Sequence, residues 1–290
     1  RNLGVGYRAL TAQSGTSDNI AIGYDALVKQ TTGANGNIAI GNYAGRAVVD
    51  SASTSQLVAI GHSVASNASA ALAGYQNVFI GYNIASTSAL AGAFQNTALG
   101  GSAMTALSTG DQNTCIGNRA GDAITTGSNN VLIGYDSGSD ALTTVSTGSN
   151  NIVLGNNSTA VAEVKVDWTV GSDERDKTDI ENLPNNAGLN FVNQLRPVTY
   201  VWDNRSNYYK PTDEKYGERD HSKKSTTKQV GFIAQEVKAI EESIGWTEDH
   251  IVNTSNEQSY KLTYSQVIPM LTKAIQELSS EVDELKNKLN

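Results

Sequence analysis

A serine and a lysine lie five residues apart in the segment Gly171-Ser172-Asp173-Glu174-Arg175-Asp176-Lys177. Serine is a weak nucleophile until a base takes its proton, and a lysine can act as that base only when its amine is neutral. Burial and a nearby cation both favour the neutral amine, and Arg175 is close enough in sequence to supply the cation. Such a pair could attack a peptide carbonyl.

The spacing alone leaves two interpretations open. Residues five apart lie about 140° from each other on an ideal helix, so Ser172 and Lys177 would need a turn between them or a contact between chains. The alternative is a helix N-cap at Ser172, with Asp173 and Glu174 favoured at the helix N-terminus.

The composition of the chain changes at this segment. Residues 1–171 hold 23 of the 27 glycines and 15 charged residues, whereas the remaining 119 residues hold all four prolines and 35 charged residues. Such different chemistry predicts two folding units, at 1–171 and 172–290. Because the chain starts at Arg1, in the middle of a repeat, we expect it to be a fragment of a longer protein.

Several classes of protein are disfavoured by composition. The single cysteine, Cys115, excludes an intrachain disulfide framework and a cysteine-based zinc site. The three histidines are far apart in sequence, and we expect neither a metal nor a cofactor. The net charge of −8 argues against nucleic acid as a partner. No apolar run is long enough to insert into a membrane.

Residues 2–158 contain nine copies of the pattern Asn-x-x-Ile-Gly-x-x-Ala. Asparagine leads eight of them, and Leu57 is the exception. The central glycines are 17 to 21 residues apart: Gly6, Gly23, Gly41, Gly61, Gly81, Gly100, Gly117, Gly134 and Gly155. A repeat of this length indicates a stacked architecture.

Each copy is typical of a short strand followed by a turn. Ile20 and Ile22 alternate with Ala21, so the large pair faces one side and the small residue faces the other, where a neighbour can approach closely. Glycine supplies a bend with positive φ, and asparagine tolerates the left-handed region and can bond its own backbone. Stacked copies predict a β-solenoid.

The solenoid could be a fibre shaft, an adhesive surface or only a spacer. We expect Asp25, Asp122 and Asp136 to be solvated in turns. Exposed tyrosines after the glycines, such as Tyr24, Tyr82 and Tyr135, could stack on sugar rings or simply cover the surface.

Two further patterns flank the second unit. Val164, Val166, Trp168 and Val170 alternate with polar residues, which predicts an amphipathic strand that holds the backbone at Ser172. Near the C-terminus a heptad seam predicts a coiled coil over about 264–289, with a single helix packed on its own domain as the alternative. The seam consists of Leu271, Ile275, Leu278, Val282, Leu285 and Leu289. Between them, the charged residues 203–228 could form a mobile arm or a solvated loop.

Three motifs support a family resemblance: Ser172-Asp173-x-Arg175-x-Lys177 with Ile180, the run Gly231 to Val237, and Tyr264 through Leu278. From Ser172 onward the chain resembles the endosialidase-type intramolecular chaperone domain, a self-cleaving Ser–Lys peptidase family found at the C-termini of phage tail spikes and fibres. The resemblance implies that Ser172 is the nucleophile, that Lys177 is the general base, and that the cut falls between Ser172 and Asp173.

The repeat of residues 2–158 resembles the YadA-like head repeats of trimeric autotransporter adhesins and similar stretches of phage tail fibres. This resemblance implies a homotrimer with the small-residue face at the interface.

Together these patterns predict a trimeric β-solenoid shaft followed by a small α+β chaperone domain that ends in a trimeric coiled-coil helix. We expect a tail fibre or spike of a virion, made in the host cytoplasm, that binds a host surface glycan or protein receptor. The alternatives are a trimerisation cap on an adhesin that never cleaves, and a polysaccharide depolymerase carried by the shaft.

Overall fold

The computed structural model describes residues 1–12, 15–30, 35–46, 56–67, 76–87, 92–139, 144–209, 213–248, 250–256 and 259–289. The chain forms two compact units, Arg1–Ala162 and Glu163–Asn290, and each is described by itself. The domain boundary that the sequence predicts at 171/172 lies inside the second unit and stays a prediction. No helix among the described residues is long and apolar enough to cross a bilayer.

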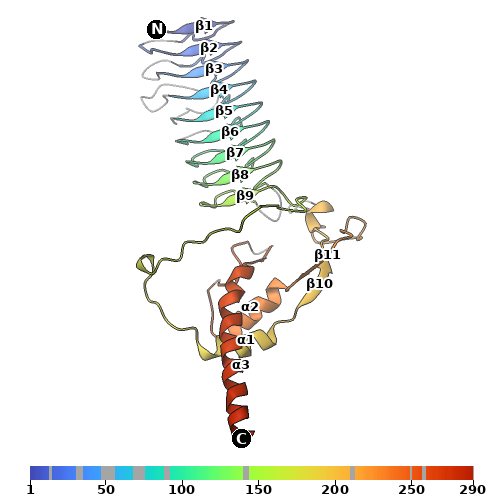
Figure 1. Cartoon of the computed structure of the whole chain (residues 1–290). Coiled ribbons are helices and arrows are strands. Elements are labelled where there is room, and N and C mark those ends of the chain that lie inside the picture. The colour runs from blue at the N-terminus through green and yellow to red at the C-terminus, as the bar shows by residue number, and fades with distance from the viewer. Residues whose placement is uncertain are drawn as a thin grey trace. The chain divides into compact units, whose positions relative to one another are not determined.

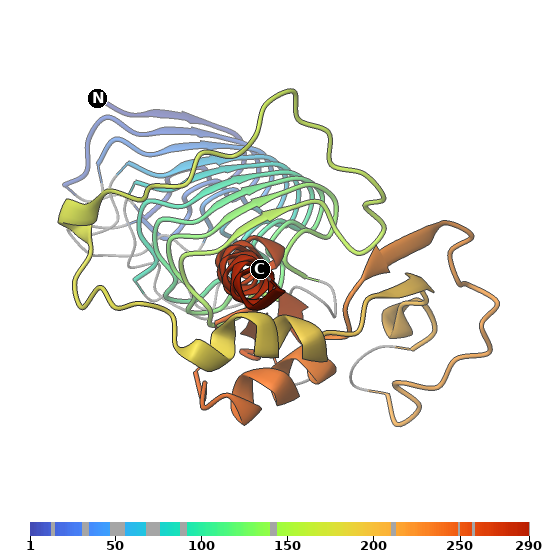
Figure 2. The ribbon, with the colours of Figure 1, turned by 60° about the horizontal axis from the view of Figure 1, so that its bottom comes forward.

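The first unit is a β-solenoid, as the repeat predicts (Figure 1). One parallel sheet holds nine three-residue strands in sequence order, one from each copy of the repeat, and Figure 2 shows their coils lying one behind another. The strands are β1 (Leu3–Val5), β2 (Ile20–Ile22), β3 (Ile38–Ile40), β4 (Val58–Ile60), β5 (Val78–Ile80), β6 (Thr97–Leu99), β7 (Thr114–Ile116), β8 (Val131–Ile133) and β9 (Ile152–Leu154).

The middle residue of each strand faces the interior of the solenoid. Ala21, Ala39, Ala59 and Cys115 are fully buried, whereas the large residues on either side of them face outward and are partly or largely exposed. This arrangement is the reverse of what the YadA-like resemblance implies, because the small-residue face is not available to a neighbouring chain. The inward row is not uniformly small, because Phe79 and Leu132 occupy the same register and are also fully buried, and residues such as Leu27 pack with them in the core.

The central glycines bend the chain, as predicted, and they also pack against each other. Eight of them have φ between 119° and 151°, and Gly155 has φ 81°. A Cβ placed on Gly61 would lie 1.6 Å from the carbonyl oxygen of Gly81 in the next coil. Glycine is therefore required both by the backbone conformation and by the close stacking of coils.

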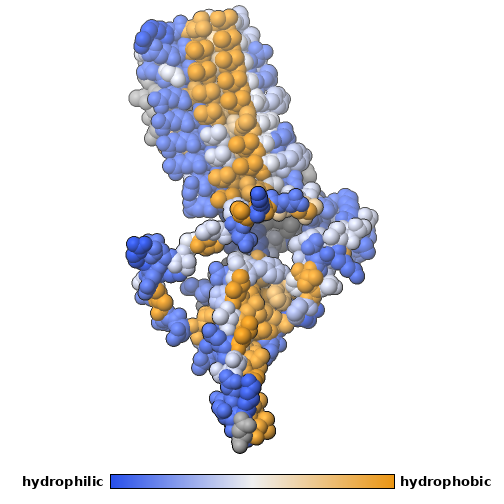
Figure 3. Space-filling model, in the orientation of Figure 1, coloured by the Kyte–Doolittle hydropathy of each residue, from blue (hydrophilic) through white to orange (hydrophobic). Residues whose placement is uncertain are grey.

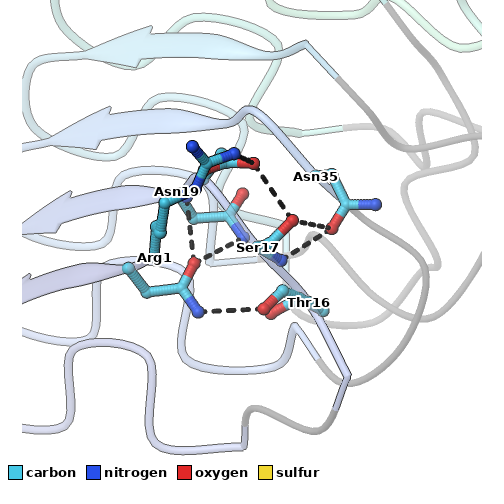
Figure 4. Close-up of polar contacts among 7 residues, drawn as sticks. Arg1, Thr16, Ser17, Asn19 and Asn35 are labelled. Carbon is cyan, nitrogen blue, oxygen red and sulfur yellow. Dashed lines mark hydrogen bonds and ion pairs between the residues drawn. The ribbon is translucent and has the colours of Figure 1, made fainter.

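The asparagines act differently from the prediction. The left-handed residue is the one before each asparagine, such as Gln112 with φ 57°. Asn113, which is buried, bonds both neighbouring coils: its side chain donates to Asn96 Oδ1 at 3.0 Å and accepts from the Asn130 backbone N–H at 3.1 Å. The first coils carry similar polar contacts, where the Ser17 backbone N–H donates to Asn35 Oδ1 at 2.7 Å (Figure 4).

The second unit is a small α+β region that ends in a long helix, as the sequence predicts. Its two antiparallel pairs are β10 (Val198–Val201) with β11 (Lys228–Gly231), and β12 (Val252–Asn253) with β13 (Lys261–Leu262). Its helices are α1 (Leu189–Gln194), α2 (Ala234–Ser243) and α3 (Val267–Leu289). Short 3₁₀ turns are η1 (Glu174–Asp176), η2 (Asn185–Ala187), η3 (Arg205–Asn207) and η4 (Tyr264–Gln266).

Helix α3 has two apolar faces. Val267, Met270 and Ala274 are buried against their own unit, where α1 packs beside α3. The predicted heptad seam lies outside this contact, and its six residues are 39 to 86 % exposed. The helix therefore packs on its own unit at one end, while the coiled coil stays a prediction. Pro269 lies in the first turn, where its missing N–H costs nothing.

The strand predicted at 164–170 is absent from the chain. Val164, Val166, Trp168 and Val170 are 61 to 80 % exposed, and no ladder pairs them. Alternation makes a segment able to pair, but a strand forms only beside a second strand edge. The backbone leading into Ser172 is thus not held by a sheet, contrary to our expectation.

Candidate functional site

The structure brings Ser172 and Lys177 together. Lys177 Nζ donates a hydrogen bond to Ser172 Oγ at 2.7 Å. This distance is within the reach that a nucleophile and its base require. Of the two interpretations of the spacing, the contact across a turn is the one observed.

A single 3₁₀ turn makes the contact possible. Asp173 is the N-cap of η1, since its side chain accepts from the Arg175 N–H at 2.9 Å, and Ser172 precedes the cap. Lys177 follows the turn with extended backbone (φ −121°, ψ 149°), and its N–H donates to the Glu174 carbonyl. The turn reverses the chain between Ser172 and Lys177, so their side chains meet. The alternative interpretation, an N-cap at Ser172, is wrong by one residue.

Arg175 pairs with Asp173 and not with the lysine. Its Nη2 lies 2.6 Å from Asp173 Oδ2, and its Nε lies 3.0 Å from Oδ1. The hydrogen bond from the Arg175 side chain, followed by that from its backbone N–H, lowers the pKa of Asp173. Arg175 is the cation that could have favoured a neutral Lys177. Its positive charge is largely compensated by the carboxylate of Asp173.

Residues 171 to 180 are all exposed to solvent. A Cβ placed on Gly171 would meet nothing within 4 Å, so the space on that side of the residue before Ser172 is open. All of the described contacts of the pair are local. The chain thus brings the two side chains into contact but leaves them in water.

A second polar cluster was not found from the sequence. Asp203 accepts from Tyr208 Oη at 2.7 Å and lies 2.7 Å from His221 Nδ1, and its backbone carbonyl accepts from Arg219. Burial by itself would raise the pKa of Asp203, but the hydrogen bonds from Tyr208 and His221 and nearby positive charges lower it. These contacts join the start of segment 203–228 to Arg219 and His221, while most of residues 213–228 are exposed, as in a solvated loop; a mobile arm stays a prediction, and residues 210–212 lie outside the described chain.

Other carboxylates of the second unit have structural roles. Glu236, in the first turn of α2, forms a two-point ion pair with Arg196. Glu277 accepts from the backbone N–H of Leu189 at 2.7 Å, at the start of α1, and pairs with Lys273 at 3.2 Å. The heptad pattern places Glu277 beside the seam and gives no signal for this contact.

The aspartates of the solenoid are less solvated than predicted. Asp25 is 2 % exposed and lies between Arg8 and Arg46, at 3.5 and 3.7 Å. Arg119 pairs with both Asp122 and Asp136. Within the described ranges, no cluster of three or more histidine, cysteine or acidic side chains could hold a metal ion.

Residues 172–246 match the family model described as chaperone of endosialidase. The match begins at Ser172, so it contains the serine–lysine pair, and it ends before α3. No curated protein and no solved structure matches the chain. A β-solenoid followed by a segment that matches this family model fits a tail fibre or spike-type protein with a chaperone role in its C-terminal part.

Proposed function

We propose that the chain is a segment of a viral tail fibre or spike whose C-terminal unit assembles three copies, assists folding of the shaft, and is then released by self-cleavage beside Ser172. The observation that carries the proposal is the hydrogen bond between Lys177 Nζ and Ser172 Oγ, at the first residue of the family match.

The cleavage step uses the two side chains in turn. Neutral Lys177 takes the proton of Ser172 Oγ as the oxygen attacks a peptide carbonyl carbon and forms a tetrahedral intermediate. The C–N bond then breaks, the lysine proton passes to the departing nitrogen, and an ester remains on Oγ. Water hydrolyses the ester with the lysine again as base, which releases a carboxylate and regenerates serine.

The geometry restricts which serine attacks which bond. For the predicted cut between Ser172 and Asp173, attack by the Oγ of the same residue on its own carbonyl would close a strained four-membered ring. The Ser172 hydroxyl of another copy avoids that ring. Attack on the Gly171 carbonyl would close a five-membered ring and would move the cut to the bond between Gly171 and Ser172. The fragment masses distinguish the two bonds.

The exposure of the pair supports a role for assembly in cleavage. A lysine acts as a base only as the neutral amine, and removal of water favours that form. The described residues of one chain leave Lys177 exposed. Neighbouring copies would supply the missing cover, so the site would be complete only after assembly.

The seam of α3 supports assembly by the C-terminal unit. Its residues repeat at heptad spacing and remain exposed in the single chain. Joining three chains first would raise the effective concentration of their shafts. Releasing the unit afterwards would leave the shaft held by a large unfolding barrier. In this proposal the fibre belongs to the virion tail and binds a host surface glycan or protein receptor.

Intact mass under denaturing conditions tests the proposal. The full chain of 30.6 kDa should yield fragments 1–172 and 173–290 after folding, whereas Ser172→Ala and Lys177→Ala should remain whole. Lys165→Ala, an exposed lysine in the same unit, is the matched control and should cleave normally. A chain that folds and assembles but stays whole would make this unit a permanent cap and would contradict self-cleavage.

A further inference from the structure

The residue directly after each central glycine belongs to a solvent-facing row along the solenoid. Backbone hydrogen bonds between successive coils keep this row in register. The Ser102 N–H donates to the Tyr82 carbonyl at 2.7 Å, and one coil further on the Arg119 N–H donates to the Gly101 carbonyl at 2.8 Å. The row lies beside the apolar band that the outward strand residues form along the solenoid (Figure 3). We call it the turn row, and it consists of Tyr7, Tyr24, Asn42, His62, Tyr82, Gly101, Asn118, Tyr135 and Asn156.

Aromatic rings of the first five coils cover one another along the turn row. Their ring centroids are 5.2 to 5.8 Å apart, and Tyr43, one residue beyond the row, supplies the ring of the third coil. His62 and Tyr82 are stacked, with 23° between their ring planes. The next row position is Gly101, which has no side chain, so the second face of the Tyr82 ring is left uncovered. Tyr82 is 58 % exposed.

The backbone at Gly101 does not require glycine. Its φ lies outside the left-handed region, unlike that of the central glycines, and other coils hold tyrosine, histidine or asparagine at the same row position. A Cβ on Gly101 would come close only to the side chain of Asn118, with Nδ2 at 2.7 Å. Glycine here therefore has one evident effect, which is to leave space between the Tyr82 ring and the Asn118 amide.

The amide of Asn118 differs from the other two amides of the turn row. Asn42 Oδ1 accepts from the Tyr24 N–H of the preceding coil at 3.2 Å. Asn156 Nδ2 donates to the Tyr135 carbonyl of its preceding coil at 3.0 Å. Within the residues that the structure describes, the Asn118 amide has no such bond, although its Nδ2 also points to the preceding coil. An exposed amide offers two donors and an acceptor, so Asn118 can bond a ligand without losing a bond to the chain.

We propose that the open face of Tyr82 and the amide of Asn118, with the position of Gly101 between them, form a binding site for a neutral hexopyranose unit of a glycan. The C–H groups on one face of the sugar ring lie on Tyr82, since the face of an aromatic ring is its negative side and attracts them. The sugar hydroxyls exchange hydrogen bonds with the Asn118 amide. The inference rests on the proposed function for the presence of a receptor, and it selects a glycan over a protein.

The charges near the site favour a neutral sugar. Arg119, the residue after Asn118, has its Nε 2.9 Å from Asp122 Oδ2 and 3.2 Å from Asp136 Oδ1. One guanidinium between two carboxylates leaves an excess negative charge, which repels uronic acids and other acidic sugars. The same excess disfavours nucleic acid, whose binding depends on cations that pair with phosphates.

Saturation-transfer NMR on the full chain tests the inference, with methyl β-D-galactopyranoside and methyl β-D-glucopyranoside as probes. We expect at least one probe to receive saturation, most strongly at the protons of one ring face. Tyr82→Ala should weaken its binding about tenfold through loss of the stacking face. Gly101→Tyr should abolish binding, because its ring would cover Tyr82 in a position that accepts tyrosine in other coils. Methyl β-D-glucopyranosiduronate should bind more weakly than the glucopyranoside.

Tyr135→Ala is the matched control and should bind the probes as the parent does. Tyr135 is 56 % exposed in the same row, but asparagines occupy the row positions on both sides of it, so its ring offers no open face. Absence of transfer to both neutral probes would overturn the inference. So would transfer that persists unchanged in Tyr82→Ala or in Gly101→Tyr, whichever shows the parent fold by circular dichroism. A glucuronide that binds as tightly as the glucopyranoside would overturn the preference for a neutral sugar.

The denatured mass of the same samples separates this inference from the proposed self-cleavage. Chains that are cut but bind neither neutral probe would overturn the sugar site alone. Whole chains that bind a probe, and lose it in Tyr82→Ala and Gly101→Tyr, would support the site and contradict self-cleavage.

Discussion

The interior of the solenoid and the segment around Ser172 differ in where their polar groups find partners. Asn113 is fully buried and bonds both the coil before it and the coil after it. Ser172 and Asp173 are exposed, and their described partners lie within five residues along the chain. The shaft interior is thus complete in one chain, whereas the reactive pair is assembled but uncovered. In the proposed function, neighbouring copies supply the cover that the pair lacks in one chain.

The largest expected effect comes from a central glycine. Gly61→Ala places a methyl group 1.6 Å from the Gly81 carbonyl oxygen and requires alanine at φ 126°. We expect the variant to fail to fold or to lose more than about 3 kcal/mol of unfolding free energy. Gly171→Ala, which meets open space, should leave the unfolding free energy unchanged. Denaturant unfolding followed by circular dichroism measures both, and a Gly61→Ala midpoint equal to the parent would refute the stacking argument.

The second effect concerns assembly. Leu278→Lys introduces a charge into the exposed seam of α3, so we expect sedimentation to show a shift from trimer to monomer and cleavage to fall with it. Ser280→Lys is the matched control, because it adds the same charge to an exposed position of α3 outside the seam. A trimer that survives Leu278→Lys would assign assembly to another surface.

The third effect concerns the asparagine ladder, the buried asparagines of successive coils that bond one another, such as Asn96, Asn113 and Asn130. Asn113→Leu removes the side-chain partner of the Gly127 carbonyl and of the Asn130 N–H, and one of the two donors that Asn113 gives to Asn96 Oδ1. Leaving buried polar groups unpaired should cost about 2–3 kcal/mol of unfolding free energy. The reciprocal change Leu57→Asn, at the one repeat that lacks asparagine, should stay within about 1 kcal/mol of the parent, since a new ladder bond offsets lost apolar burial. Similar losses for the two variants in urea unfolding would argue against the ladder.

The smallest effect is a response to acid in the second unit. The backbone N–H of Leu189, with Lys273, lowers the pKa of Glu277, and Arg196 lowers that of Glu236. Because these folded-state pKa values lie below the unfolded ones, their stabilisation is present above the unfolded pKa and is lost as pH falls through the folded pKa, over about pH 5 to 3.

We therefore expect the melting temperature of the second unit to fall by a few degrees over this interval. Tryptophan fluorescence reports this unit alone, since all three tryptophans, Trp168, Trp202 and Trp246, lie in it. Glu277→Gln should reduce the fall. A melting temperature that is the same at both ends of the interval would contradict the assignment.

The sequence predicts the solenoid well because its periodicity is local. Alternation in Ile20-Ala21-Ile22 and the glycine bend require only neighbouring residues. It does not predict which face is inside, because that depends on the distance to the opposite wall of the coil. Asparagine was misassigned for a related reason: its partners are 17 to 21 residues away, and a single repeat gives no sign of them.

The candidate site was predictable in its residues but not in its surroundings. The spacing of Ser172 and Lys177 permits a contact across a turn, and the structure shows that contact. The strand expected at 164–170 fails because pairing requires a second edge that the described chain does not supply. The Asp203–His221 contact joins residues 18 apart across a charged segment whose pattern gives no signal for it.

The central claim is that assembly completes a Ser172–Lys177 site which then cuts the chain. Native and denaturing masses, taken from the same samples during refolding, test it most directly. The account predicts that trimers of intact 30.6 kDa chains appear first and that fragments ending at or beside Ser172 appear only in them. Fragments formed in monomers, or trimers whose chains remain whole after folding is complete, would contradict it.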